Sequence, residues 1–221
     1  MATLHFAELI VQMTEATVDH EHIPMVIWNQ VNIADRTSYM LGKSTQSPLP
    51  AIVETLHSLE QAGAEMVAVP CVTAHGFYRD VVSQAKVPVL DIVAETVHAL
   101  KKKGIKHAGI MATEGTIACG FLQKALEEQG ITPYVPDENG KKRLMEIIYQ
   151  QIKANRPIDM DSFYSVANDL KSQGAEVILL GCTELPLIRR EYELEPYFFD
   201  MLELLAAVSI EACGGRLNKA I

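Results

Sequence analysis

The chain has 221 residues and a formal net charge of −9, with 48% hydrophobic and 21% charged residues. This is the composition of an ordinary globular protein, and an acidic chain without a basic stripe is not expected to bind nucleic acid or an anionic membrane. No apolar run approaches the roughly 20 residues of a membrane-spanning helix, and the first residues lack the pattern of a secretory signal. We therefore expect a cytoplasmic protein of two lobes, each of roughly 100 residues.

The first half of the chain predicts helices that alternate with short apolar strands. Apolar residues at helical spacing indicate helices at residues 2–15, 52–63, 76–85 and 92–100. Strands are expected at residues 25–28, 66–69 and 87–91, with an irregular segment at residues 32–43.

The second half repeats this alternation. Strands are expected at residues 107–112, 132–135 and 177–180, and a helix-capping turn at residues 113–116. Helices are expected at residues 117–129, 142–153, 162–172 and 202–212.

One unit of sequence occurs twice. Gly-Ala-Glu lies eight residues before Cys71 and again eight residues before Cys182, with four apolar residues following it in each case, and the two cysteines are 111 residues apart (182 − 71). A continuously apolar strand between helices is typical of a parallel sheet covered on both faces, and ligands bind at the carboxyl ends of such strands. The repeat predicts an α/β fold of two pseudo-symmetric lobes with central parallel sheets and an active site between them. We assign residues 1–98 with 200–221 to the first lobe and residues 99–199 to the second.

The repeat also predicts a strand that the first lobe does not contain. The helix at residues 2–15 matches the helix at residues 117–129, but nothing ahead of Ala2 matches the strand and turn of residues 107–116. Either the numbered chain starts late, or the first sheet is one strand short.

Cys71 and Cys182 are the main candidates for chemistry. Four cysteines in a chain of this length are too sparse for a disulfide framework, and Cys119 and Cys213 lie in helical patterns that predict core positions. Two thiols at equivalent strand ends suit a reaction in which one thiolate removes a proton from a tetrahedral carbon and the other thiol protonates the opposite face. Because an ordinary thiol has a pKa of about 8.5, the base needs help from neighbouring hydroxyls or cations.

Other roles for the same residues remain open. His75, four residues past Cys71, is expected to cap or orient rather than to react. Cys71, His75, Cys182 and Glu184 have the chemistry of zinc ligands, although their spacing fits no standard zinc motif. No phosphate-binding glycine loop or serine-hydrolase motif occurs.

Several motifs together resemble the cofactor-independent aspartate/glutamate racemase family, and the aspartate racemase branch in particular. Cys-Val-Thr-Ala-His at residues 71–75 is similar to the family's Cys-Asn-Thr-Ala-His, and Gly-Cys-Thr-Glu at residues 181–184 matches directly. Asp-Arg-Thr at residues 35–37, Ala-Thr-Glu-Gly-Thr at residues 112–116 and residues 149–153 also match. Glu184 in place of histidine favours the aspartate branch, and Val72 stands where the family has asparagine.

The resemblance implies a role for each matched residue. Cys71 and Cys182 would be the two acid/base thiols, and Arg36 and Lys153 would hold the carboxylates of a small dicarboxylic amino acid. The further substrate-binding residues would be Thr73, Thr113, Thr116, Thr183 and Glu184.

The resemblance further implies racemisation of aspartate or glutamate without pyridoxal phosphate, another cofactor or a metal, by a homodimer. The alternatives are a related enzyme, such as a maleate isomerase or a hydantoin racemase, and a non-catalytic two-lobed protein that binds an amino acid.

Overall fold

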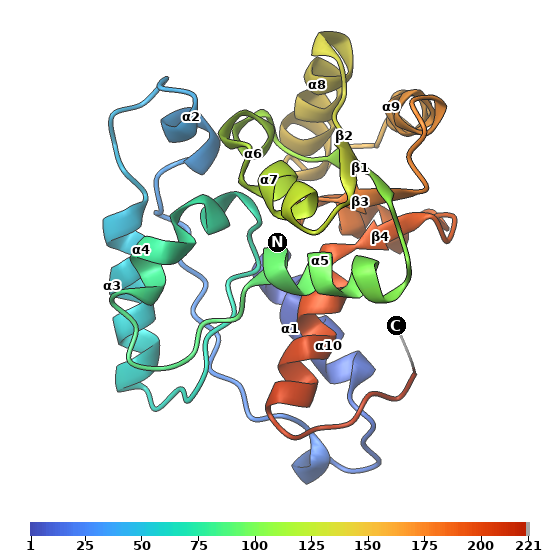
Figure 1. Ribbon diagram of the computed structural model, residues 1–221. Helices are drawn as coiled ribbons and strands as arrows, with labels where there is room; N and C mark the ends of the chain where they lie inside the picture. The colour runs from blue at the N-terminus through green and yellow to red at the C-terminus, as the bar shows by residue number, and fades with distance from the viewer. Residues whose placement is uncertain (220–221) are drawn as a thin grey trace. The chain divides into compact units, whose positions relative to one another are not determined.

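The computed structural model describes residues 1–219 and divides the chain into two compact units (Figure 1). The first unit comprises Met1–Glu95 and Leu202–Ile221, and the second comprises Thr96–Met201. Helices alternate with parallel strands, which confirms the predicted α/β class. None of the helices within residues 1–219 has the length and apolar character that crossing a membrane requires.

The second unit is built on a four-stranded parallel sheet with the strand order β2-β1-β3-β4. The strands are β1 (His107–Met111), β2 (Thr132–Tyr134), β3 (Val177–Leu180) and β4 (Phe198–Asp200). Every residue of β3 is buried, as expected for a strand covered on both faces. The sequence did not predict β4, whose three residues are too few to give a periodic signal.

Helices pack against this sheet and set the positions of its loops. α9 (Met160–Ser172) packs against β1 and β3, and α7 (Phe121–Glu128) packs against β2. The other helical segments of the unit are α6 (Glu114–Cys119), α8 (Glu138–Met145), the π-helix η3 (Glu146–Ile152) and the 3₁₀-helix η4 (Leu185–Arg190). The single helix expected at residues 117–129 is two helices, because Gly120 adopts a left-handed φ of 68° that ends α6.

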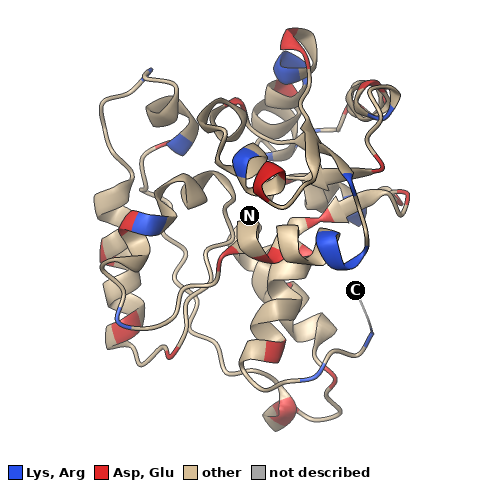
Figure 2. Ribbon diagram, viewed as in Figure 1, with Lys and Arg blue, Asp and Glu red and all other residues tan. Residues whose placement is uncertain are grey.

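Two helices run across the boundaries between the units. α5 (Ile92–Lys102) and α10 (Met201–Ala212) each contain residues of both units. α5 ends in lysines, which lie where the negative end of the helix dipole favours cations (Figure 2).

The first unit is largely helical. Its elements are α1 (Ala2–Met13), η1 (Asp19–Glu21), α2 (Arg36–Met40), α3 (Leu49–Gln61), η2 (Thr73–Phe77) and α4 (Tyr78–Val82). Buried side chains of α3 and α4 pack with Val67 and Val89 to form its core.

The three strands expected in the first unit are not formed as a ladder. Among its described residues, the parallel pairing is one bridge between Val67 and Val89, in which Val67 donates to Pro88 O and accepts from Leu90, both at 2.9 Å. Residues 25–28 are exposed and have no assigned secondary structure. A strand persists only where a neighbour pairs with its main chain, so apolar sequence alone did not suffice here.

The prediction of core positions for Cys119 and Cys213 is wrong. Both residues are exposed, because Cys119 ends α6 just before the turn at Gly120 and Cys213 follows the last residue of α10.

Gly109→Ala should destabilise the second unit. A Cβ on this residue of β1 would lie 2.7 Å from Ile178 Cδ1, 3.1 Å from Leu170 Cβ and 3.3 Å from Ala175 Cβ. We expect a loss of about 1–3 kcal/mol in the free energy of unfolding, measured by urea denaturation. Lys124→Ala, on a side chain that is 74% exposed, is the control and should change it by less than about 0.5 kcal/mol. Equal stability of the two variants would contradict the packing described for β1.

Candidate functional site

In the second unit, the loops that follow β1 and β3 lie side by side. Gly181 donates its N–H to the carbonyl of Met111 at 2.8 Å. A Cβ on Gly181 would lie 3.1 Å from Ala112 Cβ and 3.3 Å from Met111 O, so only glycine allows this close approach without a shift. The predicted residues of both loops therefore lie at one edge of the sheet, the carboxyl edge, where ligands bind in α/β proteins.

Cys182 is hydrogen-bonded to a carboxylate that also faces a lysine. The Cys182 thiol donates to Glu184 Oε2 at 3.0 Å, and Lys153 Nζ lies 3.9 Å from Glu184 Oε1. The cysteine is 5% exposed, whereas the lysine and glutamate side chains are 28% and 17% exposed. Three of the predicted site residues are thus in one chain of polar contacts.

This environment keeps Cys182 protonated. Burial is the main cause that raises the pKa of Cys182 well above its usual value, and the negative charge of Glu184 raises it further. The positive charge of Lys153 opposes both effects. At neutral pH the residue is therefore a thiol, which is the form that donates a proton.

Lys153 owes its position to an unusual helix. Its N–H donates to the carbonyl of Ile148, five residues earlier, at 3.0 Å, so the π-helix η3 continues to this residue. Single π-turns occur frequently at functional sites. η3 packs against η4, the segment that follows Glu184, and this contact brings the lysine to the glutamate.

Tyr149 contributes a contact that the sequence analysis did not predict. Lys153 Nζ lies 4.0 Å from the centre of the Tyr149 ring, a cation–π contact that helps to hold the ammonium group. The one signal for this contact in the sequence was the spacing of four residues between Tyr149 and Lys153 within a predicted helix.

The three threonines predicted in the second unit are buried. Thr113 and Thr116 have their hydroxyl oxygens 3.1 Å apart, and Thr113 caps α6 by accepting from the N–H of Thr116. Thr183 is 3% exposed. The Thr113 hydroxyl therefore has a structural role as a helix cap in addition to any role in binding.

In the first unit, Cys71 follows the bridged segment, as the repeat predicts. It is partly buried, and its carbonyl accepts hydrogen bonds from Ala74 N–H at 3.1 Å and from His75 Nδ1 at 3.0 Å. Thr73 begins η2 and is 6% exposed, and Val72 is 1% exposed. Val72 is therefore a core residue of this unit.

His75 connects the Cys71 segment to the start of α5 through hydrogen bonds. Since Nδ1 must donate to the Cys71 carbonyl, Nε2 of the neutral ring is the acceptor for the N–H of Ile92 at 3.3 Å. The ring stacks on Tyr78 with centroids 5.7 Å apart. Both ring nitrogens form hydrogen bonds with main-chain groups, as expected of a residue that orients this segment.

Arg36 is carried by a helix that packs on the segment after Cys71. Asp35 caps α2 by accepting from the N–H of Ser38 at 2.7 Å, and α2 packs against η2. The rings of Tyr39 and Phe77, one from each element, are 5.8 Å apart. The predicted cation and the predicted thiol of the first unit thus belong to adjoining elements.

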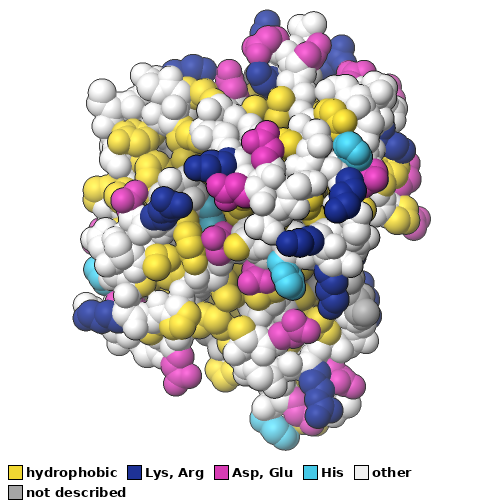
Figure 3. All heavy atoms as spheres, in the orientation of Figure 1, with side chains coloured by type: hydrophobic (Ala, Val, Ile, Leu, Met, Phe, Trp, Pro, Cys, Tyr) yellow, Lys and Arg dark blue, Asp and Glu magenta, His cyan; other side chains and the backbone are white. Residues whose placement is uncertain are grey.

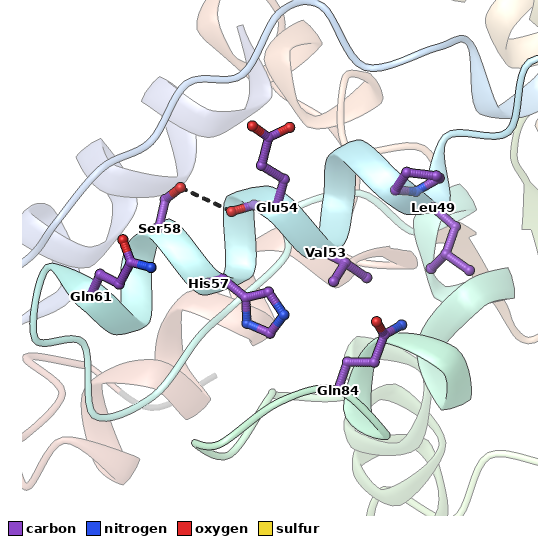
Figure 4. A pocket seen from close by; sticks show the side chains of 8 residues that line it. Leu49, Val53, Glu54, His57, Ser58, Gln61 and Gln84 are labelled. Atoms are coloured by element: carbon purple, nitrogen blue, oxygen red, sulfur yellow. Dashed lines mark hydrogen bonds between the residues drawn. The ribbon is translucent and has the colours of Figure 1, made fainter.

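A groove of about 690 Å³ on α3 contains none of the predicted site residues (Figure 4). It is lined by Leu49, Pro50, Val53, Glu54, His57, Ser58, Gln61 and Gln84. Figure 4 shows most of these side chains along α3, with Gln84 on a neighbouring segment, and the Ser58 hydroxyl donates to the carbonyl of Glu54 at 2.9 Å. Within residues 1–219, no three His, Cys, Asp or Glu side chains converge as metal ligands do.

Glu184→Gln should lower the pKa of Cys182, because it removes the negative charge beside the thiol. Lys153→Met, which removes the opposing positive charge, should raise it. The pH dependence of Cys182 alkylation by iodoacetamide, followed by peptide mass spectrometry, measures both shifts. Shifts in the same direction would contradict the geometry described for these three residues.

The stability of the protein should fall as the pH is lowered below 6.5. Burial lowers the pKa of His75 below its usual 6.5, so the unfolded chain binds a proton at this residue more readily than the folded chain does. The free energy of unfolding should therefore decrease by up to about 1.4 kcal/mol per pH unit below pH 6.5.

Denaturation with urea between pH 7.5 and pH 5 tests this, with His75→Asn as the comparison. The variant should lose that pH dependence. Folding also lowers the pKa values of four carboxyl groups, but their usual values are 4.5 or less, so they titrate mainly below this pH range; they are Glu21, Glu60, Asp159 and Glu176. An unchanged slope in the variant would show that another group is responsible.

Comparison with known proteins identifies relatives over most of the chain. The Broad specificity amino-acid racemase RacX of Bacillus subtilis (strain 168) is 26% identical over 160 residues, which are 72% of this chain and 70% of RacX. The glutamate racemase of Vibrio cholerae serotype O1 is 28% identical over 171 residues, which are 75% of this chain and 62% of that protein.

The structure of Picrophilus torridus aspartate racemase superimposes with a TM-score of 0.86 at 30% identity, covering 99% of this chain and 91% of that one. The model of the family described as Asp/Glu/Hydantoin racemase matches residues 1–208. The family resemblance found in the cysteine motifs is therefore confirmed, and the chain belongs to the Asp/Glu/Hydantoin racemase family.

Proposed function

We propose that the chain is a cofactor-independent amino-acid racemase that interconverts L- and D-aspartate, with glutamate as the alternative substrate. The observation that carries the proposal is the Cys182 thiol, buried and bonded to Glu184 beside Lys153, in a segment that repeats the one around Cys71. Membership of the racemase family and the similarity to an aspartate racemase support the reaction class.

The proposed reaction is an exchange of protons at the α-carbon. The Cys71 thiolate takes the α-proton, so that the C–H bond breaks and an S–H bond forms. The Cys182 thiol then gives its proton to the opposite face of the carbon, and the configuration inverts. Cys182 is suited to be the donor in this direction because its raised pKa keeps the proton on sulfur. Reaction of the other enantiomer runs the same steps in reverse.

A dicarboxylic substrate fits the charges of the proposed site. Lys153 and Arg36 are the cations of the matched motifs, and each would bind one carboxylate. A substrate carboxylate bound to Lys153 would bring a second negative charge near Glu184. This charge would favour the protonated form of Cys182, which is the form that donates a proton. Thr73, Thr113, Thr116 and Thr183 would add hydrogen bonds.

Two other functions are less well supported. A maleate isomerase or hydantoin racemase would use related residues, but the pair of cations favours an open dicarboxylate over a cyclic hydantoin. A protein that only binds an amino acid would not need thiols in equivalent places of both repeats. The homodimer and the cytoplasmic location stay predictions.

Cys71→Ser and Cys182→Ser should each lower racemisation of L-aspartate by about 10²-fold or more, because a serine hydroxyl cannot replace a thiol as acid or base at neutral pH. Loss of optical rotation, with incorporation of deuterium at the α-carbon in heavy water, measures the reaction. Cys119→Ser, at an exposed thiol, is the control and should keep full activity. Binding of aspartate without any α-proton exchange by the parent protein would refute the proposed reaction and favour a binding protein.

A further inference from the structure

The groove along α3 is lined by polar side chains that present hydrogen-bond acceptors. Nε2 of Gln84 donates to the carbonyl of Asp80 at 3.1 Å, which leaves Oε1 of this amide as a free acceptor. The Ser58 hydroxyl has given its hydrogen to the carbonyl of Glu54. The carboxylate of Glu54 can only accept. The oxygen atoms of these three side chains are therefore the groups that remain to bind a ligand.

His57 adds a nitrogen acceptor, and a buried carboxylate fixes its tautomer. The side chain of Glu60 is 8% exposed and accepts from the N–H of Lys86 and from His57 Nδ1, the latter at 3.1 Å. The Lys86 N–H is the main cause that lowers the pKa of Glu60, so this carboxyl group is ionised and can only accept. Nδ1 of His57 therefore carries the hydrogen, and Nε2 of the neutral ring is an acceptor. Within residues 1–219, Nε2 has no hydrogen-bond partner.

Apolar side chains form the rest of the groove, namely those of Leu49, Pro50 and Val53. Figure 4 shows Val53, His57 and Gln84 pointing into the space between α3 and the segment that carries Gln84. Apolar side chains also lie at the surface over α3 and α4 (Figure 3). A ligand in this groove would therefore meet hydrogen-bond acceptors beside an aliphatic wall.

The charges around these acceptors favour a cation. Glu54 is exposed and has no salt bridge to any residue that the structure describes. Glu60 supplies a second carboxylate next to His57, and Lys86 is the cation whose charge acts on Glu60. Two carboxylates beside one ammonium group attract a positively charged ligand and disfavour an anion.

We propose that the groove along α3 binds an aliphatic primary amine in its ammonium form, at a site apart from the cysteine motifs. The ammonium group has three N–H donors and no acceptor, so it would donate to His57 Nε2 and Gln84 Oε1. Glu54 lies three residues before His57 on α3 and would supply the opposite charge. The alkyl chain would pack on Val53 and its apolar neighbours. An amino acid is disfavoured, because its carboxylate would face that of Glu54.

Butylamine is the probe for this site, and butanoate and 1-butanol are ligands of similar size without the ammonium group. We expect butylammonium to produce saturable NMR shifts of the His57 ring and the Gln84 side-chain amide in the full chain at pH 8.5. Butanoate and 1-butanol should bind at least several-fold more weakly. Equal shifts from butylammonium and butanoate, or the absence of a saturable shift, would overturn the proposal.

Three variants at exposed positions test the residues of the site. Glu54→Gln removes the negative charge and Gln84→Leu removes an acceptor, so each should weaken butylammonium binding several-fold. Glu128→Gln is the control, because this side chain of α7 in the second unit is 62% exposed and lies outside the groove, and it should keep the affinity of the parent. Equal affinity of all three variants would overturn the proposal.

Discussion

The pairing of β3 with β1 is the constraint on which the candidate site of the second unit depends. The bond from Gly181 to Met111, and the absence of a side chain on Gly181, let the two strand ends approach closely. The loop after β1 and the loop that carries Cys182 therefore meet at one edge of the sheet. A larger residue at Gly181 would separate them and would displace the adjacent Cys182.

The polar contacts at this edge combine opposing charges. Burial and Glu184 keep the proton on Cys182, while Lys153 limits how far the thiol pKa rises. The lysine itself is held by a π-helical turn and by the ring of Tyr149. In the proposed reaction, this balance would determine how readily the Cys182 thiol gives up its proton and takes it back.

The two units show how far one sequence pattern determines structure. Residues 66–69 and β3 are both preceded by Gly-Ala-Glu and followed by a cysteine segment, and Val67 and Ile178 make equivalent bonds to the next segment. Only β3 is a strand, because only β3 has a partner on its other side. An apolar sequence favours burial, but it forms a strand only where a neighbouring strand pairs with it.

The sequence by itself determined the α/β class, most helices, the duplicated cysteine units and the family, since helical periodicity and motif spacing are local properties. It also predicted Cys182, Glu184 and Lys153 as site residues. The tertiary structure alone decided that η3 and η4 pack so that Lys153 reaches Glu184, and that His75 binds the main chain of Cys71 and Ile92. It also decided which apolar segments became strands. These outcomes depend on contacts between residues far apart in the chain, and no local pattern encodes them.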